Sequence, residues 1–85
     1  MRSDQKIKYI VYEGDLNDTC VIFPNWVSHL DMATTLGALV LGAGFVDIEV
    51  NSDGHVEFTA HGKSQSLGIE SRLEDTLLLN KQFAQ

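Results

Sequence analysis

One stretch in the middle of the chain alternates between apolar and polar residues on both sides of a glycine-containing turn. Only one antiparallel register places both apolar sets on the same face, and its pairs are Val50 with Val56, Ile48 with Phe58, and Val46 with Ala60. This register leaves a three-residue loop at 52–54, with Gly54 at the position that needs a positive φ. Pattern and turn chemistry therefore both predict a β-hairpin.

Patterns before this hairpin predict a second hairpin and a helix. Residues 6–13 and 19–23 are rich in β-branched and aromatic residues, and the turn-forming segment 14–18 separates them. Ser28 is a good N-cap for a short helix, and Gly37 is placed to end it in the left-handed conformation. The helix is therefore expected between these two residues.

The residues after the central hairpin predict the last elements. Residues 65–67 are expected to form a brief edge strand, and Ser71, with Glu74 three residues later, is expected to cap a final helix. The order is then β-β-α-β-β-(β)-α. We expect an α+β fold in which an antiparallel sheet of four to five strands has two helices on one face.

The size of the chain limits what can stabilise it. Its 85 residues allow a single domain, residues 1–85, with a small core. Cys20 is the only cysteine, so no disulfide can form within the chain. Apolar residues occupy both faces of the first predicted hairpin, and a partner chain could cover one of them. A homodimer is therefore expected.

The charge of the chain excludes several classes of partner. Twelve acidic residues outnumber six basic ones, for a formal net charge of −6. Such a chain repels phosphate backbones and lacks a basic cluster for anionic lipids, so neither direct nucleic-acid binding nor membrane binding is expected. The longest apolar run, 36–46, is too short to span a bilayer. With no export signal and one free cysteine, a cytoplasmic location is expected.

The predicted register gathers acidic residues on the outer face of the central hairpin. Glu49 lies directly opposite Glu57, with Asp47 beside them, and like charges in that position destabilise a strand pair. Solvent, Lys6 and Lys8, a bound cation or a basic partner surface could compensate. His61 shares this face with His55. The two residues are six positions apart on one strand, a distance of about 20 Å, so they cannot share one metal ion.

Few residues suggest chemistry. Cys20 and His29 are the only thiol–imidazole possibility, and the cysteine sits among apolar residues, as a buried structural cysteine does. No catalytic, cofactor-binding or metal-binding residue is predicted. Residues 42–44 suit a bulge or close packing better than a phosphate loop. Trp26 either packs over the end of the core or serves as an interface anchor.

Three segments carry a resemblance: residues 23–33 (FPNWVSHLDMA), 42–46 (GAGFV) and 62–75 (GKSQSLGIESRLED). They resemble small uncharacterised proteins encoded by tailed phages and prophages. This sequence has Leu73 where proline would be expected in that pattern. The resemblance covers about a third of the chain and brings no assigned activity. It implies a small intracellular accessory protein that binds a host or phage protein.

These observations favour a non-catalytic accessory or protein-binding module. Its candidate interaction surface consists of Trp26, His29, Asp47, Glu49, Glu57 and His61. One alternative is a small enzyme or ligand-binding domain that uses His29, Cys20 or His61. Another is an acidic mimic that blocks a basic protein surface.

Overall fold

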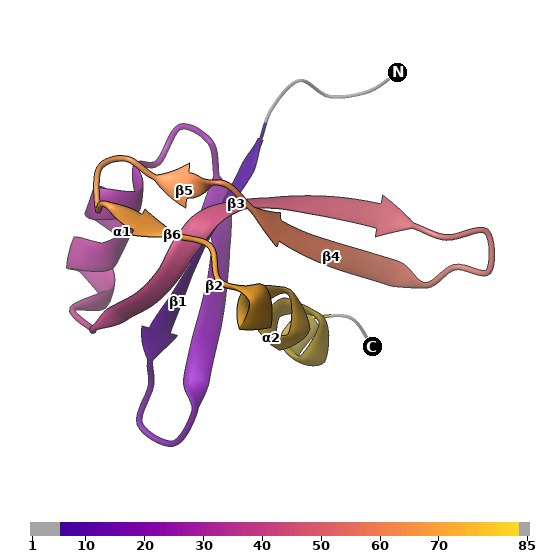
Figure 1. Ribbon diagram of the computed structural model, residues 1–85, viewed down its shortest axis with the longest axis horizontal. Helices are drawn as coiled ribbons and strands as arrows, with labels where there is room; N and C mark the ends of the chain where they lie inside the picture. Colours follow the sequence, from indigo (N-terminus) through magenta and orange to yellow (C-terminus); the bar gives the residue numbers. More distant parts are fainter. Residues whose placement is uncertain (1–5, 84–85) are drawn as a thin grey trace.

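Six strands and two helices make up most of residues 6–83, the part of the chain that the computed structural model describes (Figure 1). In chain order they are β1 (Ile7–Glu13), β2 (Asp18–Pro24), α1 (His29–Leu36), β3 (Val40–Val50), β4 (Val56–His61), β5 (Lys63–Ser64), β6 (Ile69–Glu70) and α2 (Leu73–Phe83). The α+β class predicted from the sequence is therefore confirmed.

Four strands form one antiparallel sheet in the order β2-β1-β3-β4, and β5 and β6 form a separate two-stranded sheet. The eleven-residue strand β3 has two partners. Its first part, from Val40 to Val46, pairs with β1, and its last part, from Phe45 to Val50, pairs with β4. The outer half of the β3–β4 hairpin therefore extends away from the rest of the sheet (Figure 1).

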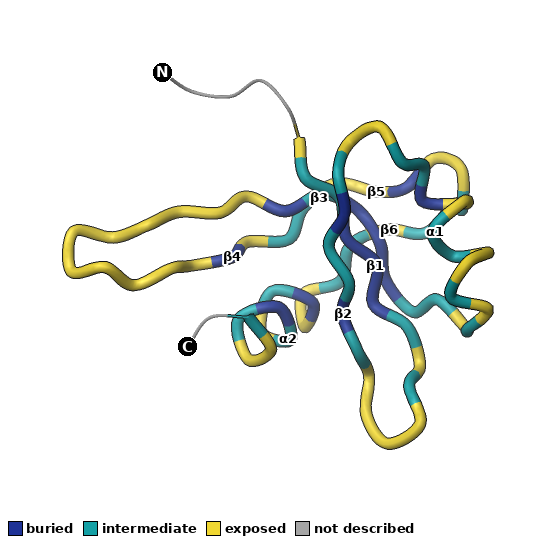
Figure 2. Tube along the Cα trace, turned by 180° about the vertical axis from the view of Figure 1, so that it is seen from behind, coloured by how far each residue is buried: buried dark blue, intermediate teal, exposed yellow. Residues whose placement is uncertain are grey.

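We call residues 47–57 the arm, because every one of them is exposed (Figure 2). The register of the hairpin is the predicted one, with Val50 opposite Val56, Ile48 opposite Phe58, and Val46 opposite Ala60. Gly54 has a φ of 90°, and its N–H donates to the carbonyl of Asn51 at 2.9 Å. The predicted hairpin is confirmed in both register and turn.

The two helices cover opposite faces of the sheet. On one face, Leu79 of α2 packs into a buried cluster with Tyr9 and Val11. On the other face, Met32 and Ala33 of α1 pack against Ile10. Adjacent residues of a strand point to opposite faces, so the prediction of both helices on one face is wrong. The apolar residues at both parities of β1 are covered by this chain's own helices.

Helix α1 begins and ends as predicted. The Ser28 hydroxyl oxygen accepts a hydrogen bond from the backbone N–H of Asp31 at 2.9 Å, which satisfies one donor of the first turn. Gly37 adopts a left-handed conformation with a φ of 62°, and its N–H donates to the carbonyl of Ala33. Both caps act locally, so the sequence alone predicts them.

The segment before α2 differs from the prediction. Residues 65–67 form the turn between β5 and β6 and not a strand. Helix α2 begins at Leu73, so Arg72 and not Ser71 precedes it. The carboxylate of Asp75 accepts from the backbone N–H of Arg72 at 2.9 Å, as the third residue of a helix does in a capping box. The predicted cap of Ser71 with Glu74 is therefore displaced by one residue.

Helix α2 also protects both edges of the four-stranded sheet. The side-chain amide of Asn80 donates to the carbonyl of Phe58 in β4 and accepts from its N–H. Gln82 makes the same pair of bonds with Cys20 in β2. Side chains of one helix thus replace the missing neighbouring strand at each edge, which removes open backbone groups that could pair with another chain.

Candidate functional site

A cavity of about 500 Å³ lies on the face of the sheet that carries α1. Its lining comes from β1, β3, the start of α1 and the β5–β6 turn, and consists of Lys8, Ser28, His29, Phe45, Lys63, Gln65 and Ser66. We call this cavity the lysine pocket. Within residues 6–83, two lysines and no acidic residue line it, which is unusual for a chain whose net charge is −6.

His29 forms the buried wall of the lysine pocket, with only 4% of its surface exposed. Its Nε2 donates to the carbonyl oxygen of Gly44 at 2.8 Å, since a carbonyl can only accept. The ring packs edge-on against Phe23 and Phe45, with centroids 5.5 and 5.8 Å away. Burial lowers the pKa of His29, the nearby Lys8 lowers it further, and the Gly44 carbonyl opposes both effects. The imidazole is therefore neutral at pH 7, with its proton on Nε2.

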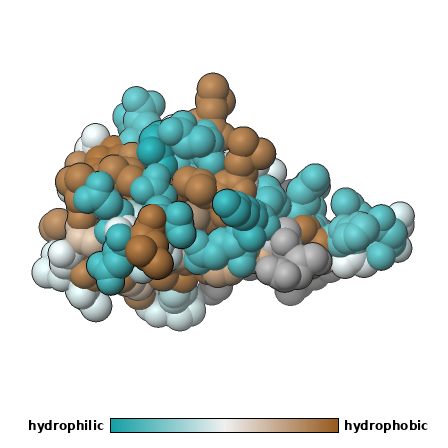
Figure 3. Space-filling model, turned by 90° about the horizontal axis from the view of Figure 1, so that it is seen from below, coloured by the Kyte–Doolittle hydropathy of each residue, from teal (hydrophilic) through white to brown (hydrophobic). Residues whose placement is uncertain are grey.

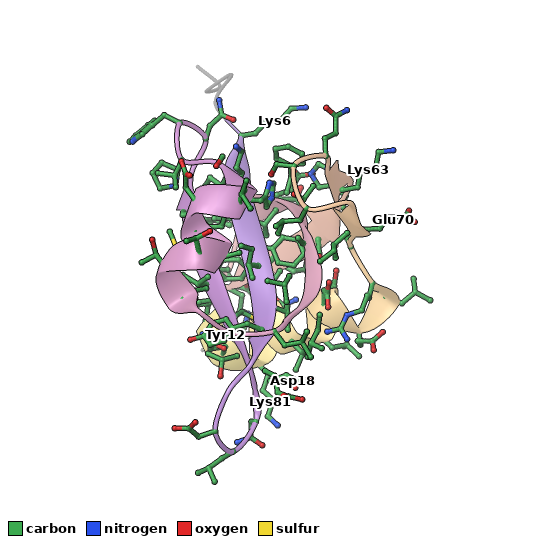
Figure 4. The ribbon with its side chains drawn as sticks, turned by 90° about the vertical axis from the view of Figure 1, so that its left-hand side faces the viewer. Lys6, Tyr12, Asp18, Lys63, Glu70 and Lys81 are labelled. Carbon is green, nitrogen blue, oxygen red and sulfur yellow. The ribbon has the colours of Figure 1, made fainter. Side chains whose placement is uncertain are left out.

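Three lysines surround Phe45. The Lys8 ammonium donates to the carbonyl of Val27 at 3.0 Å, and the Lys6 ammonium lies 5.2 Å from the centre of the Phe45 ring. Lys63 is exposed on β5, where Glu70 of β6 is its backbone partner. Figure 4 shows Lys6 and Lys63 at the same end of the molecule. Glu70, the strand partner of Lys63, lies at this end as well.

The carboxylates of the arm find no such cations. Glu49 lies directly opposite Glu57, as predicted. Within residues 6–83, no lysine or arginine forms an ion pair with Asp47, Glu49 or Glu57. Lys6 and Lys8 contact Phe45 and Val27, so the prediction that they compensate this acidic face gains no support. Asp47 has one partner, the Nε2 of His61, at 3.2 Å.

Cys20 is buried, as the sequence indicated, and the thiol–imidazole pair with His29 that the sequence left open does not form. Cys20 packs in the cluster on the α2 face, whereas His29 lies on the α1 face, so the sheet separates them. Burial raises the pKa of Cys20 to about 11, so the thiol is protonated and a poor nucleophile at neutral pH. His61 lies at the base of the arm, where its ring centroid is 6.2 Å from that of Phe45, so the Phe45 ring stands between His61 and His29. The three residues do not converge on one site.

Trp26 is 75% exposed, so it does not pack over the end of the core. It lies in the turn that joins β2 to α1, and the same turn supplies Ser28 to the lysine pocket. The predicted interaction residues therefore divide into two groups on one face of the sheet. His29 and Trp26 are at or beside the pocket, and Asp47, Glu49 and Glu57 belong to the arm, with His61 at its base.

A second polar cluster, which the sequence did not predict, lies buried on the other face. The Tyr9 hydroxyl donates to Oδ2 of Asp75 at 2.6 Å, and both residues are fully buried. Nε of Arg72 donates to Oδ1 at 2.9 Å, and its Nη2 lies 2.8 Å from the same oxygen without hydrogen-bond geometry. Burial and the Asp75 carboxylate raise the pKa of Tyr9. Because Tyr9 and Asp75 are buried and no ligand can reach them, we interpret this cluster as a structural contact that holds α2 against the sheet.

Glycine at position 42 makes room for this cluster. A Cβ there would collide with Oδ2 of Asp75. The register between β1 and β3 also shifts beside this position, at Val11 and Tyr12. Of the predicted alternatives at residues 42–44, a bulge or close packing, close packing is confirmed, and at Gly42 the approaching residue is Asp75 in the first turn of α2.

Other features of the described residues bear on the kind of site. None of the helices within 6–83 is long and apolar enough to cross a membrane. No group of three or more His, Cys, Asp or Glu side chains that could hold a metal ion occurs in this part of the chain. Comparisons with protein families, with curated proteins and with solved structures found no match.

Proposed function

We propose that this protein is a non-catalytic protein-binding module whose arm docks on a basic surface of a partner protein. The observation that carries the proposal is the projecting hairpin itself. Residues 46–61 contain four carboxylates and neither lysine nor arginine. Seen from below, hydrophilic side chains dominate this projecting end of the molecule (Figure 3).

Two features of the arm lower the stability of the protein when no partner is bound. Glu49 and Glu57 repel one another across the strand pair, and no lysine or arginine of residues 6–83 forms an ion pair with either. On the reverse face, Ile48, Val50 and Val56 are 39%, 70% and 38% exposed. A partner with lysine or arginine residues around an apolar surface would relieve both defects, because it would neutralise one face and bury the other.

The resemblance to phage and prophage proteins suggests where that partner belongs. We propose a host or phage protein, in line with the accessory role that the resemblance implies. The nucleic-acid mimic is the special case in which the basic surface normally binds DNA or RNA. Homodimerisation also stays a prediction, and the exposed apolar face of the arm is the surface that would carry it.

Affinity capture from cells that encode the protein tests the proposal. The arm variant is the double substitution Glu49→Gln and Glu57→Gln, and the matched control is Glu13→Gln with Asp15→Asn at the exposed β1–β2 turn. We expect a captured partner to be lost with the arm variant and retained with the control, and to dissociate as salt rises. A partner retained equally by both variants would overturn the proposal. Light scattering of the two variants separates a second copy of this chain from a different protein.

A further inference from the structure

We propose that the lysine pocket is a binding site for the phosphate group of a small molecule, with Lys8 and Lys63 as its cations. This inference goes beyond the protein-binding role of the arm and does not depend on it. The arm presents carboxylates to a partner, whereas the pocket gathers positive charge on the body.

The distribution of charge is the first argument. The chain has only six lysine and arginine residues, and two of them, Lys8 and Lys63, line this cavity, while the ammonium of Lys6 lies over the ring of its lining residue Phe45. None of the acidic residues in the described part of the chain lines the cavity. Glu70, the backbone partner of Lys63, is on β6 and outside the lining.

The kind of donor indicates phosphate over carboxylate. Lysine binds a phosphate as a point charge, and a phosphate offers several charged acceptor oxygens to the surrounding donors, where a carboxylate offers only two. Among residues 6–83 the pocket offers two lysines together with the hydroxyl groups of Ser28 and Ser66. The Ser28 oxygen accepts from the N–H of Asp31, which leaves its O–H free to donate to a ligand.

The remaining lining residues suggest the rest of the ligand. His29 uses Nε2 for Gly44, so in its neutral form only Nδ1 is left, as an acceptor. The ring of Phe45 gives the cavity an apolar wall. A volume of about 500 Å³ is sufficient for a phosphate joined to an organic group, and it falls in the range typical of small-molecule sites.

The neighbourhood of the pocket disfavours a long polyanion. Phe45 and Asp47 lie two residues apart on β3 and so on the same face of the sheet, where the acidic face of the arm begins. A nucleic acid that entered the pocket would pass these carboxylates and be repelled. A single phosphate group on a small molecule would not extend that far.

An NMR titration of the full chain at low salt tests the proposal. The probes are inorganic phosphate, a nucleoside monophosphate, the same nucleoside without phosphate, and acetate. We expect saturable shifts of the backbone amides of Gln65 and Ser66 with the two phosphates and none with the nucleoside or acetate. Lys63→Gln should weaken phosphate binding roughly tenfold. The matched control Lys81→Gln, an exposed lysine of α2, should leave it unchanged.

Several results would overturn the proposal. These are no saturable shift with either phosphate, acetate binding as tightly as phosphate, or equal weakening by Lys63→Gln and Lys81→Gln. Binding of a phosphopeptide by a protein that ignores both free phosphates would show that the ligand is a macromolecule and not a small molecule. Because the arm is unchanged in every variant, none of these outcomes bears on the capture experiment.

Discussion

Strand β3 runs from the body of the sheet into the arm, yet the two regions differ in how far their residues are buried. In the body, three consecutive residues of β1, Tyr9, Ile10 and Val11, are fully buried because a helix covers each face. In the arm, all residues from 47 to 57 are exposed (Figure 2). The difference teaches that apolar alternation marks a strand face without guaranteeing that the same chain covers it. Substitutions should therefore separate the two regions sharply.

The largest separation is expected for two aspartates. Asp75→Ala would leave the Arg72 guanidinium and the Tyr9 hydroxyl without their buried partner, and we expect it to lower the free energy of unfolding by about 3 kcal/mol. Asp53→Ala, at the tip of the arm, should change it by less than about 0.5 kcal/mol. Urea denaturation of both variants measures the difference. Similar losses of unfolding free energy in the two variants would mean that the buried cluster does not stabilise the contact between α2 and the sheet.

A smaller separation is expected for the helix that protects the sheet edges. Asn80→Ala removes the side-chain bonds to the backbone of Phe58, and it should cost about 2 kcal/mol because a buried edge is left unsatisfied. Asn51→Ala in the loop of the arm is the comparison, with an expected loss well below about 1 kcal/mol. Faster hydrogen exchange at Phe58 in Asn80→Ala would locate the effect. Unchanged exchange there would contradict the protective role of α2.

The sequence predicted the arm better than the body because the arm is defined by local rules. Its register follows from period-two alternation and from Gly54, which lie within a few residues of one another. The placement of α1 and α2 on opposite faces depends on contacts between distant segments. Apolar residues at both parities of β1 look alike whether a helix or a second chain covers them. The structure shows that helices of this chain cover both faces, so these residues no longer support a homodimer, which stays a prediction.

The same reason explains which parts of the site could be predicted. Glu49 opposite Glu57 follows directly from the hairpin register, and it was predicted. The lysine pocket was not, because its lining comes from four segments that only the fold brings together. Asp75 looks like an ordinary acidic residue of a first helical turn. Its burial depends on the missing side chain of Gly42, and nothing near Asp75 in the sequence signals that.

The pH dependence of stability gives a third comparison, between two histidines. Burial holds the pKa of His29 below its usual value of about 6.5. Below about pH 6.5 the unfolded chain binds the proton more readily, so stability should fall as the pH decreases, by at most about 1.4 kcal/mol per pH unit. His29→Gln should flatten this fall, whereas His55→Gln in the exposed arm should keep it. An NMR titration of His29 in the wild-type protein measures the same pKa shift directly. The prediction can therefore be tested even if the His29→Gln variant folds poorly.

The smallest expected effect has the opposite sign and belongs to the arm. Glu49→Gln and Glu57→Gln each remove one of two opposed charges, so each should raise the free energy of unfolding by about 0.3 kcal/mol at low salt. The double variant should be no more stable than either single variant, because one substitution already ends the repulsion. High salt should erase the gain by screening. Additive gains that persist in salt would mean that the two glutamates do not repel one another, and the arm would then need no basic partner to relieve it.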